Sequence, residues 1–206
     1  MFWTKVLIAA AAGYLLGNLN GALLISRWVY KSDIRNSGSG NAGLTNYFRT
    51  YGGLRTLIVL AIDVAKTVAA CMLGGALLRG LGLYEFGKML GGAFTVLGHM
   101  FPVFFHFRGG KGILCCAAIA GAMDWWAFAV ILGTFILVLV LTKYVSLGSC
   151  MGAVVFAPSL AWRFPGNTPV IVMALLLSLM AIYMHRENIG RLIHGTESKF
   201  TFHKKN

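Results

Sequence analysis

The sequence is poor in charged residues. Only 12% of its 206 residues are Asp, Glu, Lys or Arg, whereas about a quarter of the residues in an ordinary soluble domain are charged. Hydrophobic residues make up 58% of the chain, and the mean hydropathy is +0.75. This deficit of charge, together with long apolar runs, excludes an ordinary soluble domain and predicts an all-α integral membrane protein.

Acidic residues are especially scarce. The chain has 18 Lys and Arg against 6 Asp and Glu, so its formal net charge is +12. In a soluble protein this excess would indicate nucleic acid as a partner. In a membrane protein it indicates the bias of basic residues toward the cytosolic side, and it also attracts anionic substrates and lipid head groups. We therefore predict membrane lipid, and no nucleic acid, as a partner.

The cysteine patterns of metal sites and disulfide frameworks are absent. Cys71, Cys115, Cys116 and Cys150 lie inside apolar segments, with no C-x-x-C pair and no cluster of histidines beside them. We interpret them as small buried apolar residues. The sequence thus predicts no metal site and no cofactor.

Apolar stretches recur along the chain. The first resembles a signal peptide, but its apolar part is longer than a typical signal, so we interpret it as a retained helix. A shorter run, GILCCAAIAGAM, either crosses the membrane or forms a re-entrant segment. The expected spans are 3–26, 54–78, 86–107, 112–123, 125–142, 145–163 and 168–185.

Charge decides whether the short run crosses. If it does, 13 of the 18 basic residues lie on one side and 4 on the other, with Lys66 inside a span. If it does not, the two sides hold 8 and 9, and the bias disappears. The sequence therefore predicts a compact bundle of seven transmembrane helices with the N-terminus outside and the C-terminus in the cytosol. We expect one domain, 1–206, with polar loops 30–53 and 107–112 and the tail 186–206 on the cytosolic face.

Four polar stretches interrupt the apolar pattern, and the first is RNSGSGNAGLTN, residues 35–46. Its G-x-G-x-x-G spacing does not indicate a dinucleotide fold, because no strand precedes it. Its glycines allow backbone N–H groups to form an anion-binding nest, and the following residues can start a short helix whose first amides face the anion. Arg35 and Arg49 add guanidinium groups suited to phosphate. The alternative is a flexible Gly/Ser loop.

The second stretch, GHMFPVFFHFRGGKG, places Lys111 among Gly109, Gly110 and Gly112 at the same membrane face. A lysine there can reach a phosphate while the glycine backbone bends around it. The alternative is a tight turn between helices. A P-loop is excluded, because Phe105 stands where the first glycine is needed.

The third stretch, HRENIGRLIHGTE, brings His185, Asn188 and Arg191 to one helix face. Its alternative is an amphipathic tail lying on anionic lipid. The fourth, KYVSLGS, places Ser146 and Ser149 at the inner start of a span.

Three ionisable residues, Asp63, Lys66 and His99, lie well inside the expected spans and away from their ends. Asp63 and Lys66 stand at i, i+3, and such residues pair with each other or line a cavity. An ion pair that fixes helix packing and a role in the site fit equally well. His99, similarly, fits a packing histidine or a base.

Taken in this order, the four stretches resemble the PlsY family, the acyl-phosphate-dependent glycerol-3-phosphate acyltransferases of bacterial phospholipid synthesis. The resemblance covers nearly the whole chain, and DVAK in the second span also fits. The chain departs from the family pattern at Leu44, where GLTN replaces G-A-T-N, and at Ile113–Cys116, where a small apolar run with Thr is usual. It departs again at LLGNLNG in the first span.

The resemblance implies transfer of a fatty acyl group from acyl phosphate to the 1-hydroxyl of glycerol 3-phosphate, at the cytosolic face of a bacterial inner membrane. The products would be 1-acylglycerol 3-phosphate and phosphate. We expect direct attack without an acyl-enzyme, because no Ser-His-Asp triad is evident and the H-x-x-x-x-D motif of other glycerolipid acyltransferases is absent. The alternatives are a transporter of an organic phosphate, although no internal repeat is present, and a structural lipid-binding subunit.

The resemblance and side-chain chemistry together give each site residue an expected role. Catalytic roles fall to His185, Asn188, Ser39 and Lys111, with His185 the best candidate base and the substrate's own phosphate its rival. Phosphate-binding roles fall to Ser37, Gly38, Gly40, Asn41, Thr45, Asn46, Arg49, Gly109, Gly110, Gly112 and Ser149.

Overall fold

The computed structural model describes residues 1–200, in which helices are joined by loops and turns. The α-helices are α1 (Phe2–Gly17), α2 (Gly21–Tyr30), α3 (Leu44–Tyr51), α4 (Arg55–Arg79), α5 (Tyr84–Met100), α6 (Ile113–Met123), α7 (Trp125–Thr142), α8 (Val145–Arg163), α9 (Thr168–Met184) and α10 (Arg186–Ile193). Two short 3₁₀ helices, η1 (Ile34–Asn36) and η2 (Val103–Phe105), lie in loops. The predicted all-α class is confirmed.

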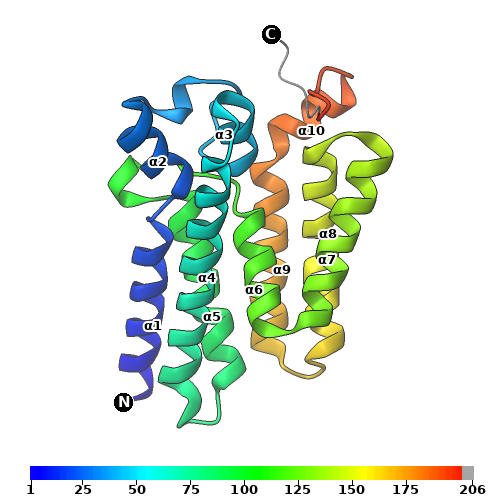
Figure 1. Ribbon diagram of the computed structural model, residues 1–206. Coiled ribbons are helices and arrows are strands. Elements are labelled where there is room, and N and C mark those ends of the chain that lie inside the picture. Colours follow the sequence, from blue (N-terminus) through cyan, green and yellow to red (C-terminus); the bar gives the residue numbers. More distant parts are fainter. Residues whose placement is uncertain (201–206) are drawn as a thin grey trace.

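The long helices stand side by side and run between two ends of the molecule (Figure 1). The N-terminus lies at one end, and α2, α3 and α10 gather at the other. Among the described residues, five segments are long and apolar enough to cross a bilayer: α1 with α2, α4, α5, α7 and α8. A sixth is α9 with α10, a pair bent by 54°. The chain is therefore an integral membrane protein.

The first expected span is not one helix but breaks into α1 and α2 at two asparagines. The side chain of Asn18 accepts a hydrogen bond from the backbone N–H of Phe104 at 3.3 Å. The side chain of Asn20 accepts one from the backbone N–H of Leu23 at 3.0 Å and so caps α2. Hydropathy did not reveal the break, because the apolar residues continue across it.

A buried ion pair holds the two halves of the broken helix. The Lys66 ammonium donates to the carbonyl oxygens of Gly17 at 3.2 Å and Leu19 at 2.9 Å, where α1 ends. Asp63 accepts from the backbone N–H of Gly21 at 3.2 Å, where α2 begins, and lies 2.6 Å from Lys66. Each charge thus faces the helix terminus of opposite polarity. The pair fixes helix packing, one of the two roles that the sequence left open.

Helix α5 packs closely against α1 and α4. A Cβ atom at Gly17 would lie 2.4 Å from the Thr95 carbonyl oxygen, and one at Gly74 would lie 2.1 Å from that of Gly87. Larger residues would push these helices apart. The Thr95 hydroxyl also donates to the carbonyl oxygen of Gly13 at 3.0 Å, which ties α5 to α1.

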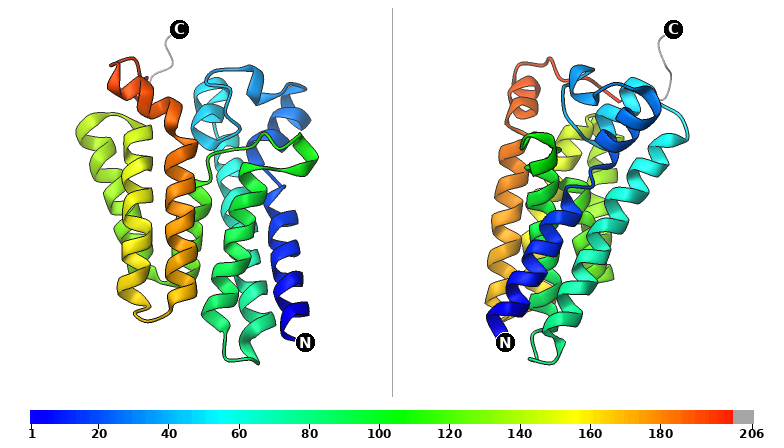
Figure 2. Two further views of the ribbon diagram at one scale, coloured as in Figure 1. Left: turned by 180° about the vertical axis from the view of Figure 1, so that it is seen from behind. Right: turned by 90° about the vertical axis from the view of Figure 1, so that its left-hand side faces the viewer.

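Helix α6 occupies the middle of the bundle, where it packs against α4, α5, α7 and α8. The chain leaves α5, passes through η2 and crosses the bundle before α6 begins (Figure 2). The four cysteines are buried and free, as expected.

We predict that Lys66→Met lowers the free energy of unfolding by about 3–5 kcal/mol, because it leaves the Asp63 carboxylate buried without its cation. Denaturant titration in mixed micelles measures this change. The double variant Asp63→Asn/Lys66→Met should cost less than the sum of the two single changes, since the lost interaction is counted once. Strictly additive costs would contradict the pairing.

Candidate active site

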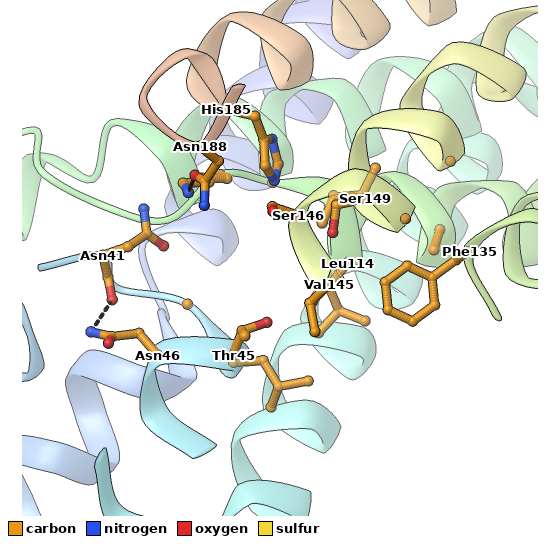
Figure 3. A pocket seen from close by; sticks show the side chains of 18 of the residues that line it. Asn41, Thr45, Asn46, Leu114, Phe135, Val145, Ser146, Ser149, His185 and Asn188 are labelled. Atoms are coloured by element: carbon orange, nitrogen blue, oxygen red, sulfur yellow. Dashed lines mark hydrogen bonds between the residues drawn. The ribbon is translucent and has the colours of Figure 1, made fainter. Parts of the chain in front are cut away.

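A cavity of about 320 Å³ lies at the end of the bundle where α3 and α10 gather (Figure 3). Its polar lining consists of Ser39, Asn41, Thr45, Asn46, Arg49, Asp63, His99, Lys111, Ser146, Ser149, His185, Asn188 and Glu197. Its apolar lining includes Leu44, Leu60, Ile113, Leu114, Ala117, Ile131, Leu132, Phe135 and Val145.

Asn46 organises the first glycine stretch from within. Its side-chain NH₂ group donates to the carbonyl oxygens of Ile34 at 3.2 Å, Ser37 at 2.9 Å and Asn41 at 2.9 Å, the last of which is drawn in Figure 3. Its side-chain oxygen accepts from the backbone N–H of Ser39 at 2.9 Å. Since these bonds occupy its amide, Asn46 shapes the loop and does not fit the expected role of a phosphate donor.

The glycines of this loop are conformationally required. Gly38 and Gly40 have φ angles of +58° and +71°, which favour glycine. A Cβ atom at Gly38 would lie 2.2 Å from the side-chain oxygen of Asn46. Ser37, Gly38 and Gly40 do not line the cavity, so the structure places them behind the residues that do.

Helix α3 presents its N-terminus to the cavity. Gly43 is its N-cap, and no side chain caps the first turn, so the amides of Leu44 and Thr45 stay unpaired within the helix. This confirms the expected short helix. Arg49, one turn later, lines the same cavity and donates to the carbonyl oxygen of Ser198 at 3.2 Å.

Arg35, at the other end of the loop, does not line the cavity. Its guanidinium group donates to the carbonyl oxygens of Phe105 at 2.8 Å and Arg108 at 3.0 Å, and forms a salt bridge with Asp33 at 2.7 Å. Hydrogen bonds from Arg35 hold the pKa of Asp33 well below its usual range. Arg35 therefore ties two loops together, and the suggestion that it binds phosphate is corrected.

Lys111 and the C-terminal segment meet in one hydrogen-bonded chain. Lys111 donates to the side-chain oxygen of Asn188, whose NH₂ group donates to Glu197 at 2.7 Å. Arg191 also donates to Glu197 at 2.7 Å. Burial and the nearby charge of Arg191 lower the pKa of Lys111 to about 8. An anion beside Lys111 would favour its charged form.

The two glycines before Lys111 attach its loop to the end of α5. The backbone N–H groups of Gly109 and Gly110 donate to the carbonyl oxygens of Met100 and His99, both at 3.0 Å, where α5 ends. Those amides are therefore not available to a phosphate, in contrast to the expectation. Gly112, with a φ of +79°, caps α6 and borders the cavity.

His185 presents a free ring nitrogen to the cavity. Its Nδ1 atom lies 2.7 Å from the carbonyl oxygen of Ala181, which can only accept, so Nδ1 carries the proton. The Nε2 atom then keeps its lone pair. In Figure 3 the ring points toward Ser146 and Ser149 of α8. This geometry fits a general base.

Two cavity residues were not assigned a role from the sequence. Ser146 lies one turn before Ser149, and this i, i+3 spacing on one helix face was the available signal. Glu197 lies in the quoted GTE segment and is buried. Burial raises its pKa, but the hydrogen bonds from Arg191 and Asn188 outweigh this effect and lower the pKa below its usual value. Among residues 1–200, no three His, Cys, Asp or Glu side chains gather as metal ligands.

Directly beside the polar groups the lining becomes apolar. Figure 3 shows Leu114, Val145 and Phe135 next to Ser149. Leu44 and Leu114, which lie at the departures from the family pattern, both border the cavity. The cavity thus joins an anion-binding end to an apolar end, which suits a ligand with an anionic head and a hydrocarbon chain.

We predict that Gly38→Ala weakens the affinity for glycerol 3-phosphate, the acceptor that the resemblance implies, at least about tenfold, because the new Cβ atom displaces Asn46 and with it the loop. Gly53→Ala is the matched control, since Gly53 also has a positive φ, +68°, but has no atom within 4 Å of its Cβ position. It should cost about 1 kcal/mol of stability and leave binding unchanged. Calorimetric titration in micelles measures the affinity, and equal effects of the two substitutions would contradict the argument.

Comparison with known proteins identifies the family of this chain. The family model of glycerol-3-phosphate acyltransferase matches residues 7–195. The glycerol-3-phosphate acyltransferase of Thermoanaerobacter pseudethanolicus is 41% identical over 93% of this chain and 94% of its own. That of Pseudomonas entomophila is 37% identical over 97% and 100%.

Solved structures of PlsY, described as an integral membrane glycerol 3-phosphate acyltransferase, share the fold. The glycerol 3-phosphate form has a TM-score of 0.86 at 30% identity, over 95% of this chain and 96% of the other. The lysophosphatidic acid form has a TM-score of 0.83 at 28% identity, over 95% of each chain. These enzymes overturn the transporter and structural-subunit alternatives. The chain belongs to the glycerol-3-phosphate acyltransferase family and is a membrane-embedded acyltransferase of lipid synthesis.

Proposed function

We propose that the protein transfers a fatty acyl group from acyl phosphate to the 1-hydroxyl of glycerol 3-phosphate, giving 1-acylglycerol 3-phosphate and inorganic phosphate. The observation that carries the proposal is that cationic and amide groups stand beside an apolar wall in one cavity. The solved relatives are described in a glycerol 3-phosphate form and a lysophosphatidic acid form, which matches the acceptor and the product.

Phosphate binding is assigned to two places. The uncapped start of α3, with Ser39, Thr45 and Arg49, forms one, because free backbone amides and a guanidinium group both favour an anion. Lys111 forms the other, held by Asn188. Both border one cavity, so two phosphate-bearing substrates can lie within reach of each other.

In the proposed reaction the acceptor hydroxyl oxygen attacks the acyl carbonyl carbon. The bond between that carbon and the bridging oxygen breaks, and phosphate leaves with the electron pair. The proton of the hydroxyl passes to Nε2 of His185 or to the departing phosphate. Lys111 and Ser149 stabilise the charge on the carbonyl oxygen and the phosphate. Because acyl phosphate carries its own leaving group, direct transfer needs no acyl-enzyme.

For the membrane arrangement we propose seven crossings, with α6 as the short one, in a bacterial inner membrane. One domain comprises the whole chain, with the N-terminus outside and the cavity at the cytosolic end. The distribution of charge supports this orientation. Lys5, Arg79, Lys88 and Arg163 lie in the segments near the N-terminal end of the bundle, while 11 of the 16 basic residues in the described part, 1–200, belong to the opposite side.

The proposed transfer predicts that purified protein releases phosphate from palmitoyl phosphate only when glycerol 3-phosphate is present, with 1-acylglycerol 3-phosphate formed in equal amount. His185→Ala and Lys111→Ala should each lower the rate by about 10²-fold or more, because they remove a base and a charge. Lys31→Ala is the control, since Lys31 is exposed and does not line the cavity. Rates near wild type in both site variants would refute the assigned roles.

The pKa of Lys111 predicts a pH dependence. Because this pKa is about 8, the free enzyme loses the charge on Lys111 as the pH rises through that value. Phosphate esters, with a second pKa near 6, are already dianions there. The KM for the phosphate substrate should therefore rise above pH 8, by up to about tenfold per pH unit. Lys111→Arg should abolish this rise, since arginine stays charged, and an unchanged profile in that variant would assign the rise to another group.

A further inference from the structure

Beneath the two phosphate-binding loops lies a buried polar cluster made of Asn20, Asp63, Lys66 and His99. His99 and Asp63 line the cavity from below, although each is at most 3% exposed. The proposed reaction gives none of these residues a role. Their contacts reach beyond the break between α1 and α2, to both loops.

Lys66 fixes the ring of His99. Besides the two carbonyl oxygens at the end of α1, its Nζ atom lies 2.6 Å from Asp63 and 3.1 Å from Nδ1 of His99. Four acceptors thus surround an ammonium group with three N–H bonds, and the group has no freedom to turn. The NH₂ group of Asn20 lies 3.4 Å from the same Nδ1 atom. Asp63 lies farther from Nδ1, at 3.6 Å. Since the two nearer neighbours donate, Nδ1 accepts, and the neutral ring carries its proton on Nε2.

The other edge of the ring supports the lysine loop. A Cβ atom at Gly110 would lie 2.2 Å from Nε2 of His99, so the backbone beside Lys111 rests against the imidazole. The backbone N–H of Gly110 also donates to the carbonyl oxygen of His99 at 3.0 Å. The position of Lys111 therefore depends on where the ring lies.

The same cluster holds the first glycine loop. The NH₂ group of Asn20 donates to the carbonyl oxygen of Ala42 at 3.0 Å, and Ala42 directly precedes the N-cap of α3. A Cβ atom at Gly110 would lie 2.8 Å from this carbonyl oxygen. Gly110 is thus wedged between His99 and Ala42, and the two loops meet over one imidazole.

We propose that His99 is a positioning residue that sets the spacing between the two phosphate-binding loops, with Lys66, Asp63 and Asn20 holding its ring. A shift of about 1 Å in such a spacing can reduce activity by about 10²-fold. The hydrogen bonds that hold the two loops do not depend on the reaction that the protein catalyses. The kinetic consequence rests on the proposed function.

His99→Leu tests the proposal, because it removes the acceptor for Lys66 and the support for Gly110. We expect the KM for glycerol 3-phosphate to rise at least about tenfold, with a smaller change in kcat, because both phosphates lose their fixed spacing. Amide hydrogen exchange in the segment 105–114 should accelerate, since the Gly109 and Gly110 bonds open more often. His99→Gln places an amide NH₂ group near the Nε2 position, beside Gly110, and should restore much of both properties.

Thr95→Val is the matched control. Thr95 lies one turn earlier on α5, is buried, and bonds to the carbonyl oxygen of Gly13 in the same α1–α5 contact, but it touches neither loop. It should leave the KM and the exchange of 105–114 unchanged. If Thr95→Val matched His99→Leu, the effect would be general packing and the proposal would be overturned.

Two further outcomes are decisive. Unchanged exchange and KM in His99→Leu would overturn the proposal. If this variant does not fold, His99→Asn carries the same prediction, because it keeps an acceptor for Lys66 near the Nδ1 position but leaves no atom at the Nε2 position to support Gly110. Hydrogen exchange needs no turnover, so a wild-type protein without acyl transfer would refute the proposed function while the exchange comparison still tested His99.

Discussion

The structure depends on one buried ion pair placed at a break in a helix. Removing two charges from water is costly unless each finds partners, and here the partners are helix termini. Lys66 meets the carbonyl end of α1 and Asp63 meets the amide end of α2. The helix can therefore break inside an apolar bundle without leaving its end groups unpaired. The residues after the break return over the bundle as α3 and the loop before it, and these supply one wall of the cavity.

The cavity takes its polar character from helix ends and its apolar character from helix sides. The start of α3, the loop before α6, the start of α8 and the end of α9 all reach it. Helix ends have unpaired backbone groups and tolerate polar side chains, whereas the sides of membrane helices are apolar. Because these four polar regions meet above the sides of α6 and α7, one cavity has a polar part and an apolar part. An acyl phosphate likewise has a polar phosphate group and an apolar hydrocarbon chain.

The structure corrects several roles that the sequence predicts, because it shows which partners each side chain bonds. Asn46 and Arg35 look like phosphate donors in the sequence, yet their donors are occupied by loop carbonyls. Gly109 and Gly110 are expected from the sequence to bind phosphate, yet their amides close the end of α5. A residue's type reveals how many bonds it can make, but not which neighbours take them. The i, i+3 spacing of Ser146 and Ser149, by contrast, is visible in the sequence. It indicates that both side chains face the same way, although only Ser149 is assigned a role from the sequence.

The sequence by itself determined the membrane class, the positions of most helices and the four polar stretches that gather at one end. Hydropathy and charge are local properties, so they can be summed along a chain without knowledge of contacts. The tertiary structure decided where the first helix breaks, which donors stay free, and that one imidazole joins two loops. These outcomes depend on competition for hydrogen bonds between residues that are as far apart in the chain as Asn20 and His99, and no local pattern records that competition.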